Sequence, residues 1–288
     1  MLGVMSGSEY MERLYRLIPW VEDPFTAEGF KRYRDTVSEF GVVVKHRWFS
    51  ELMNRRRELR VIDLCSGTGI GGIALARVLM DLGVSVSLTL VDLRRDALDK
   101  AVEFGLRELG FKPQIMVRDI LEILGERLRT GFDVSLIWGL TTPHFSPWDW
   151  VRVLSNVSRL LTDDGLFLYN ESDRVYTIFY LKGYRDLLPE VVERDRVILT
   201  IHKGKDFRSG YIKRLVLNLV SREAEETKVY FWDLASSAAF TWIFFSDVDF
   251  IPTRGSHSGV VIARSPRRAL NLEALFKEKP SILMHEQP

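Results

Sequence analysis

The chain has 288 residues and a formal net charge of +1, so it can hold one large α/β domain and has no overall basic field to gather nucleic acid. The single cysteine, Cys65, excludes an internal disulfide, and no His/Cys cluster has zinc-site spacing. No apolar run reaches the roughly 18 residues that span a bilayer, and residues 1–10 lack the pattern of a secretion signal. We therefore expect a soluble, cytoplasmic protein with neither a structural metal nor a membrane partner.

The first segment, residues 1–59, has helical periodicity. Apolar residues recur every three or four positions and so lie on one helix face; they are Phe30, Tyr33, Val37, Phe40, Val44, Trp48 and Leu52. Asp23 followed by Pro24 indicates a helix start, because proline at the first helical position loses no useful N–H. We expect a helical extension that covers the next domain as a lid.

From residue 60 to about residue 172, short apolar runs alternate with helical stretches, which is typical of a parallel sheet with helices on both faces. The expected strands are Arg60–Leu64, Val84–Val91, Gln114–Val117, Asp133–Trp138 and Leu166–Asn170. Gly83 and Gly110 stand where the first two intervening helices should end.

After Asp173 the alternation stops. We expect a hairpin of Val197–Ile201 with Tyr211–Val220, followed by an apolar helix at Asp233–Phe245. A closing antiparallel pair of strands is expected at Val248–Ile251 and Gly259–Ala263. The sequence thus predicts a doubly wound, mostly parallel seven-stranded α/β sheet with an antiparallel last strand. This domain would span residues 60–265 with an insertion at about 174–230, followed by a loose tail, 266–288.

A glycine-rich turn gives the strongest local signal. In the segment from Val61 to Gly72, an apolar strand is followed by the turn Gly67-x-Gly69-x-x-Gly72, and a helix begins after it. Glycines at such a turn let the backbone approach a ligand closely. A tight packing turn is the alternative. The same glycines match the dinucleotide-binding pattern, but Asp63 would repel a pyrophosphate and would suit the cationic groups of S-adenosylmethionine.

With this acid and G-x-G turn, residues from about 61 to 172 resemble the class I S-adenosylmethionine-dependent methyltransferase superfamily, which has a Rossmann-like fold. Cys65 departs from the pattern, because it stands where the family most often has its first glycine. The resemblance implies that Asp63 helps hold the methionine portion of the cofactor. The cofactor contacts that it implies are Asp63, Cys65, Gly67, Gly69, Asp92, Leu93, Asp119, Ile120 and Trp138.

Two further acids follow strands of the expected sheet. Asp92 stands where a carboxylate binds ribose hydroxyls, and it is also suited to cap the helix from Arg94. Asp119 matches a position that contacts the adenine amino group in many family members, and with Glu122 it also forms a capping box for a next helix. Each acid therefore has a binding and a structural interpretation.

Candidate catalytic residues follow the fourth and fifth strands. His144 could remove a proton from an acceptor, since imidazole titrates near neutral pH, or could serve as a structural hydrogen-bonding group. Thr141 and Thr142 precede it in the same loop. This loop lacks the Asn/Asp-Pro-Pro-aromatic signature of amino methylation on nucleobases. Glu171 and Asp173 could bind a polar substrate or act as base, or could be solvated loop carboxylates.

The segment 202–214 interleaves cations with aromatic residues and could contact RNA, although a solvated hairpin tip has the same composition. The leading hypothesis is methyl transfer from S-adenosylmethionine to a small or medium-sized acceptor. The alternatives are an NAD(P)-dependent oxidoreductase, or a non-catalytic binding protein that uses this basic hairpin.

Overall fold

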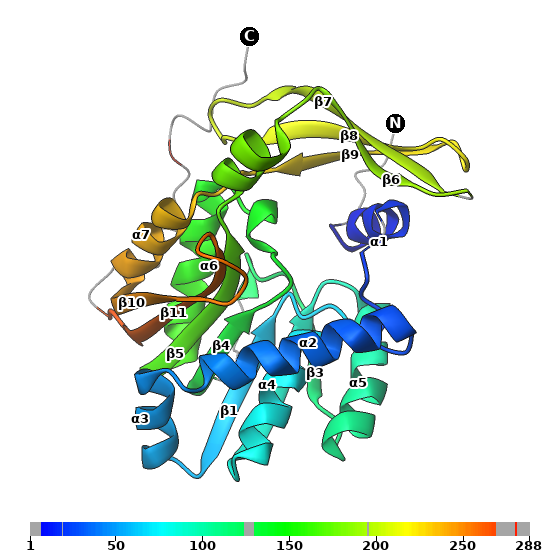
Figure 1. Ribbon diagram of the computed structural model, residues 1–288. Helices are drawn as coiled ribbons and strands as arrows, with labels where there is room; N and C mark the ends of the chain where they lie inside the picture. The colour runs from blue at the N-terminus through cyan, green and yellow to red at the C-terminus, as the bar shows by residue number, and fades with distance from the viewer. Residues whose placement is uncertain (1–6, 19, 124–129, 195, 269–279, 281–288) are drawn as a thin grey trace.

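The computed structural model describes residues 7–18, 20–123, 130–194, 196–268 and 280. A large sheet with helices on both faces forms the body of the molecule, and a smaller sheet lies beyond one end of its strands (Figure 1). Most of the predicted tail, 266–288, falls outside the described residues.

The body is a seven-stranded sheet with the order β10-β11-β5-β4-β1-β2-β3. Its strands are β1 (Glu58–Leu64), β2 (Ser85–Asp92), β3 (Gln114–Val117), β4 (Phe132–Ile137), β5 (Leu161–Ser172), β10 (Phe245–Pro252) and β11 (Ser258–Pro266). The first five pair in parallel, whereas β11 is antiparallel to both of its neighbours, β5 and β10. This confirms the predicted mostly parallel sheet, and it places the antiparallel last strand inside the sheet, between β5 and β10.

Successive side chains of each strand enter opposite helix layers, because a strand alternates its faces. Val61 packs into the layer that holds α2 to α5, and its neighbour Ile62 packs into the layer that holds α6 and α7. These helices are α2 (Ala27–Val43), α3 (Arg47–Arg55), α4 (Ile70–Asp81), α5 (Arg95–Leu109), α6 (Pro147–Leu160) and α7 (Leu234–Phe244). Both sheet faces are thus buried, and the carboxyl ends of the parallel strands are left for a ligand.

The aromatic stripe predicted for the N-terminal segment is buried against this sheet. Tyr33 and Phe40 on α2 are 3% and 0% exposed, and the Phe40 ring lies 4.2 Å from the ring of Trp138. The predicted start at Asp23-Pro24 is wrong. The helix begins at Ala27, because the hydroxyl of Thr26 accepts a hydrogen bond from the Gly29 N–H at 3.1 Å and caps the first turn.

The insertion forms a four-stranded antiparallel sheet, larger than the predicted hairpin. Its strands are β6 (Leu187–Val192), β7 (Val197–Lys205), β8 (Ile212–Asn218) and β9 (Glu223–Val229), paired in chain order. The central pair, β7 and β8, is the predicted hairpin. Sequence analysis missed β9 because its Glu-Ala-Glu-Glu-Thr-Lys-Val run is mostly polar and exposed, without the β-branched and aromatic residues that mark a strand.

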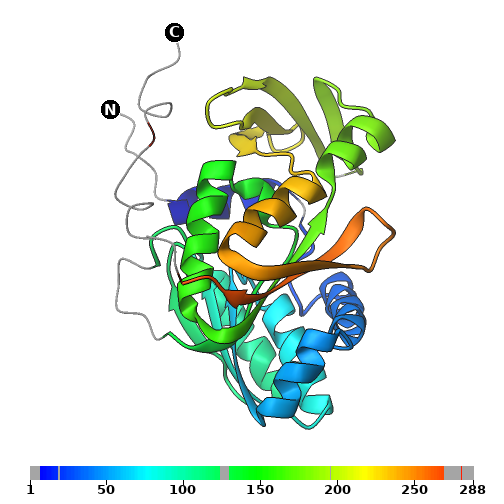
Figure 2. The same ribbon diagram turned by 90° about the vertical axis from the view of Figure 1, so that its left-hand side faces the viewer.

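The N-terminal extension is divided between the two sheets. Helix α1 (Gly7–Leu17) packs through Leu14 and Leu17 against Ile198 and Val216 of the small sheet, whereas α2 and α3 belong to the body. Figure 2 shows α1 beneath the small sheet, facing the body. We call α1 and β6–β9 together the cap.

Within the part of the chain that the structure describes, no helix combines the length and apolarity needed to cross a membrane. In the same ranges, no group of three or more His, Cys, Asp or Glu side chains is arranged to hold a metal ion.

Candidate active site

The turn after β1 uses three residues with left-handed backbone conformations. Gly67 has φ 53° and Gly69 has φ 78°, where Gly69 is the N-cap of α4. Cys65 has φ 57°, a conformation that a side chain makes costly and that glycine adopts freely. Cys65 therefore keeps the left-handed backbone conformation that suits the glycine of the family pattern, although it carries a side chain.

Asp63 lies beneath this turn and does not line the cavity above it. Its carboxylate is fully buried and accepts a hydrogen bond from the Gly72 N–H at 2.7 Å through Oδ2, whereas Oδ1 has no partner. Burial raises the pKa of Asp63 well above its ordinary value. The position suits a residue that fixes the first turn of α4 more than one that touches a ligand directly.

Asp92 connects the second strand to the glycine turn. Its Oδ2 accepts a hydrogen bond from the Gly67 N–H at 2.7 Å, and its Oδ1 accepts one from the Arg94 N–H at 2.9 Å. Asp92 is not the N-cap of α5: that residue is Arg94, which makes no side-chain capping bond, and Asp92 only accepts the N–H of Arg94. Each carboxylate oxygen can accept a second bond, and Asp92 lines the cavity, so ribose binding remains compatible with this geometry.

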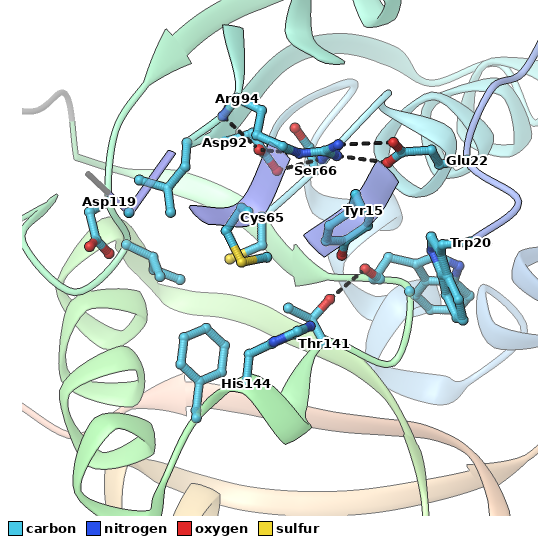
Figure 3. A pocket seen from close by; sticks show the side chains of 18 of the residues that line it. Tyr15, Trp20, Glu22, Cys65, Ser66, Asp92, Arg94, Asp119, Thr141 and His144 are labelled. Atoms are coloured by element: carbon cyan, nitrogen blue, oxygen red, sulfur yellow. Dashed lines mark hydrogen bonds and ion pairs between the residues drawn. The ribbon is translucent and has the colours of Figure 1, made fainter. Parts of the chain in front are cut away.

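A polar strap from the N-terminal segment crosses the same turn. Glu22 forms a two-pronged ion pair with the guanidinium of Arg94, at 2.9 and 2.7 Å, and its carbonyl oxygen accepts a bond from the Thr68 hydroxyl. The Arg94 guanidinium also lies 4.3 Å from the ring centre of Tyr15, on α1 (Figure 3). Sequence analysis missed Glu22 and Arg94, because this pairing depends on a contact across 72 residues.

Asp119 follows β3 and closes another side of the cavity with Ile120 and Leu121. Its Oδ1 accepts a hydrogen bond from the Leu121 N–H at 2.8 Å, as expected of a local cap. The helix that Asp119 and Glu122 were predicted to begin would start at Ile120, but residues 120–122 form a turn, and residues 124–129 lie outside the described residues.

The loop after β4 forms the wall opposite the glycine turn. The side chain of Asn170, on β5, accepts hydrogen bonds from the backbone N–H groups of Gly139 and Leu140 at 3.0 and 2.9 Å. Trp138 packs so closely on α4 that a β-carbon at Gly71 would lie 2.5 Å from it. The close contact explains the need for a small residue at this position of the glycine segment.

His144 ends a short 3-10 helix (Thr142–His144) in this loop and lines the cavity, with Thr141 beside it (Figure 3). Burial, together with the nearby positive charge of Arg174, lowers the pKa of His144 to about 4. The imidazole is therefore neutral at physiological pH, and one ring nitrogen is available to accept a proton or a hydrogen bond.

The other two candidate catalytic residues, Glu171 and Asp173, do not line the main cavity. Glu171 is fully buried and accepts bonds from the Thr142 hydroxyl at 3.1 Å and the Ser172 N–H at 3.0 Å; burial raises its pKa to about 7. The interpretation of Glu171 as a solvated loop carboxylate is therefore wrong. Asp173 accepts bonds from the N–H groups of Tyr176 and Leu234, so it ties loop ends together.

The small sheet supplies the side of the cavity that sequence analysis did not find. The Tyr211 hydroxyl lies 2.7 Å from the Asp149 carboxylate and accepts a bond from the Ser146 N–H at 2.8 Å, at the capping box of α6. Lys228 lies over the Tyr211 ring, 4.5 Å from its centre. The prediction that the tip of this hairpin is solvated is thus wrong for Tyr211, which is 5% exposed, and correct for Phe207, which is 81% exposed.

Together these elements enclose a cavity of about 360 Å³, a size that small-molecule sites commonly have. Of the predicted cofactor contacts, those that line it are Cys65, Gly67, Asp92, Leu93, Asp119, Ile120 and Trp138. Asp63 and Gly69 lie behind it, and the space beside Gly69 is closed by Ala101, Ile73 and Leu90. The carboxyl ends of β1 to β4 therefore meet at one cavity, with the cap over it.

Comparison with known proteins agrees with this arrangement. Residues 61–165 match the family model described as a methyltransferase domain, and no curated protein matches the sequence. The fold is similar to that of the PH0226 protein from Pyrococcus horikoshii OT3, with a TM-score of 0.61, 18% identity and coverage of 88% of this chain and 98% of that one.

A second similar structure is an S-adenosylmethionine-dependent methyltransferase from Clostridium acetobutylicum ATCC 824, with a TM-score of 0.57, 14% identity and coverage of 85% and 96% of the two chains. A third is the CcbJ methyltransferase from Streptomyces caelestis, with a TM-score of 0.54, 15% identity and coverage of 76% of this chain and 88% of that one. Residues 61–165 thus match a methyltransferase domain, and the fold of the chain is similar to that of solved methyltransferases.

Proposed function

We propose that the protein transfers a methyl group from S-adenosylmethionine to a small acceptor that binds between the loop after β4 and the cap. The observation that carries this proposal is the convergence of the glycine turn, Asp92, Asp119 and His144 on one cavity. An acid after β2 and an acid after β3 suit an adenosine, and a loop after β4 faces the place where a bound methyl group would react.

The cavity fits an adenosyl cofactor by the chemistry of its walls. Gly67 lines the cavity with a left-handed backbone, φ 53°, which favours glycine. Asp92 has free lone pairs for ribose hydroxyls, and Asp119 with Ile120 offers a polar and an apolar edge for a base. Asp63 would act indirectly in this scheme, by holding Gly72 and hence the turn.

When bound, S-adenosylmethionine supplies an electrophilic methyl group on a sulfonium sulfur, so the protein's tasks are alignment and exclusion of water. His144 is neutral and lines the cavity, so we assign it to orient the acceptor and to take its proton where the nucleophile carries one. Tyr15 from α1 and Tyr211, just before β8, close the cavity from the cap side.

Calorimetric titration tests the cofactor assignment. We expect S-adenosylmethionine and S-adenosylhomocysteine to bind, and NAD and NADP not to bind, because residues 61–165 match a methyltransferase domain. Binding of the nicotinamide cofactors alone would establish the oxidoreductase alternative and overturn the proposal.

The acceptor can be sought with S-adenosylmethionine that carries a labelled methyl group. After incubation with a cell extract, we expect the label in a small-molecule fraction, and we expect the H144A variant to incorporate less of it while still binding the cofactor. Label in RNA would point instead to the basic strands of the cap, and an absence of any transfer would leave a binding protein as the better description.

A further inference from the structure

A smaller chamber of about 160 Å³ adjoins the main cavity on its cap side. The two spaces share Tyr15, Trp20, Gly139 and His144 in their walls. Most other side chains of the chamber are apolar and come from α1, the loop after β4 and the end of β9; they include Leu14, Ile18, Pro143 and Val229. The chamber therefore suits the body of an apolar ligand that reaches toward His144.

One cation lines this otherwise apolar chamber. Arg174 follows β5, and its guanidinium Nε is shielded from solvent and has no hydrogen-bond partner. Its Nη2 makes one long bond, 3.4 Å, to the carbonyl oxygen of Leu140. Within the described residues, no carboxylate oxygen forms an ion pair with Arg174. Because arginine stays charged in proteins, the desolvation of this group is poorly compensated.

Glu171 is the acid that acts on Arg174 electrostatically, and it compensates the charge only in part. Its Oε1 accepts bonds from the Thr142 hydroxyl and the Ser172 N–H, whereas its Oε2 is buried without a hydrogen-bond partner among the described residues and makes no ion pair with Arg174. Burial raises the pKa of Glu171 to about 7, so a large fraction of it is protonated at neutral pH. A ligand anion would supply the missing counter-charge.

We propose that the methyl acceptor is an apolar molecule that carries a carboxylate, and that Arg174 binds this carboxylate in the side chamber. This inference rests on the proposed function, because it assigns the acceptor end of the same site. A carboxylate matches the two-pronged donor geometry of one guanidinium, whereas a phosphate dianion would call for more donors than this wall offers. His144, shared by both spaces, would then lie between the anchored carboxylate and the cofactor.

The test compares matched ligands in the presence of saturating S-adenosylhomocysteine. The probes are propanoate, hexanoate, benzoate and 4-hydroxybenzoate, each with its primary amide, titrated calorimetrically. We expect at least one carboxylate to bind about 10- to 100-fold more tightly than its amide, as a charge-assisted bond to a shielded guanidinium would give. In R174M this preference should disappear, and in R174K part of it should remain.

The controls separate this inference from the proposed function. Arg95→Gln removes an exposed arginine that pairs with Asp99 on α5, and it should leave the preference unchanged. S-adenosylhomocysteine is titrated into every variant, so failure of the wild-type protein to bind it would count against the proposed function. If it binds but no carboxylate is preferred over its amide, or if the preference survives in R174M, the carboxylate inference is wrong.

Discussion

The two sides of the cavity are built in different ways. The body side comes from consecutive strand ends, and its polar groups are fixed by short backbone bonds, such as those from Gly67 to Asp92 and from Gly72 to Asp63. The cap side combines α1 with a sheet about 200 residues further along the chain, and it meets the body through side chains such as Tyr211, which donates to Asp149. The body side is therefore preorganised by the sheet, whereas the shape of the cap side depends on how α1 and the small sheet sit against the body.

The largest expected effect lies on the body side. Asp92→Asn keeps an oxygen for the Gly67 N–H and removes the negative charge, so we expect S-adenosylhomocysteine to bind about 10- to 100-fold more weakly in calorimetry. Asp99→Asn, on the exposed side of α5, is the matched control and should bind normally. Equal affinity of D92N and wild type would show that the body side does not bind the ribose through this carboxylate.

Glu171 lies below the loop that joins the two sides, and its raised pKa gives a pH signature. The folded protein holds this proton up to about pH 7, whereas the unfolded chain releases it near the ordinary value of 4.5, so the stabilisation is complete below about pH 4.5 and is lost as pH rises through 7. Glu171→Gln mimics the protonated acid and escapes this loss.

The free energy of unfolding of E171Q, relative to that of the wild type, should therefore rise by about 2–3 kcal/mol between pH 5 and pH 8. Denaturant titrations at intermediate pH values measure it. His144 gives a slope of the opposite sign, since its lowered pKa reduces stability as pH falls from 6.5 toward 4, and this slope should remain in E171Q. A pH-independent difference between the two proteins would contradict a buried, protonated Glu171.

A smaller effect is expected at the glycine turn. Cys65 has φ 57°, so Cys65→Gly should keep a free energy of unfolding within about 1 kcal/mol of wild type, because relief of strain offsets the added freedom of the unfolded chain. Cys65→Val, with a β-branched side chain, should unfold about 1–2 kcal/mol more easily than C65G. Chemical denaturation of both variants checks the order, and the reverse order would mean that this residue is not left-handed.

The smallest effect on cofactor binding concerns the cap. Tyr211→Phe removes the hydroxyl that donates to Asp149 and accepts from the Ser146 N–H, bonds worth about 1 kcal/mol each. It should speed amide hydrogen exchange in β8 without a comparable change in S-adenosylhomocysteine affinity. Tyr180→Phe, at a hydroxyl on a 77% exposed residue, is the control. If Y211F weakened cofactor binding as strongly as D92N, the two sides of the cavity would not be separable.

The sequence by itself determined the body of the protein. Alternating apolar runs predicted the five parallel strands, and the glycines and acids at their ends marked Gly67, Asp92 and Asp119, because in a parallel sheet residues that follow successive strands converge at one edge. Local periodicity and local spacing carry this information, so no knowledge of distant contacts was needed.

Only the tertiary structure decided which of the polar side chains line the cavity and which are buried beside it. In the structure Asp63 lies beneath the turn, and Glu171 is buried. Glu22 pairs with Arg94, and α1 packs under the small sheet. These outcomes depend on burial and on contacts between segments far apart in the chain, where a carboxylate that is solvated and one that is desolvated have the same local sequence. The glycine turn was therefore predictable from the sequence, whereas the proposal that Arg174 binds a substrate carboxylate depends on the chamber that the fold builds around it.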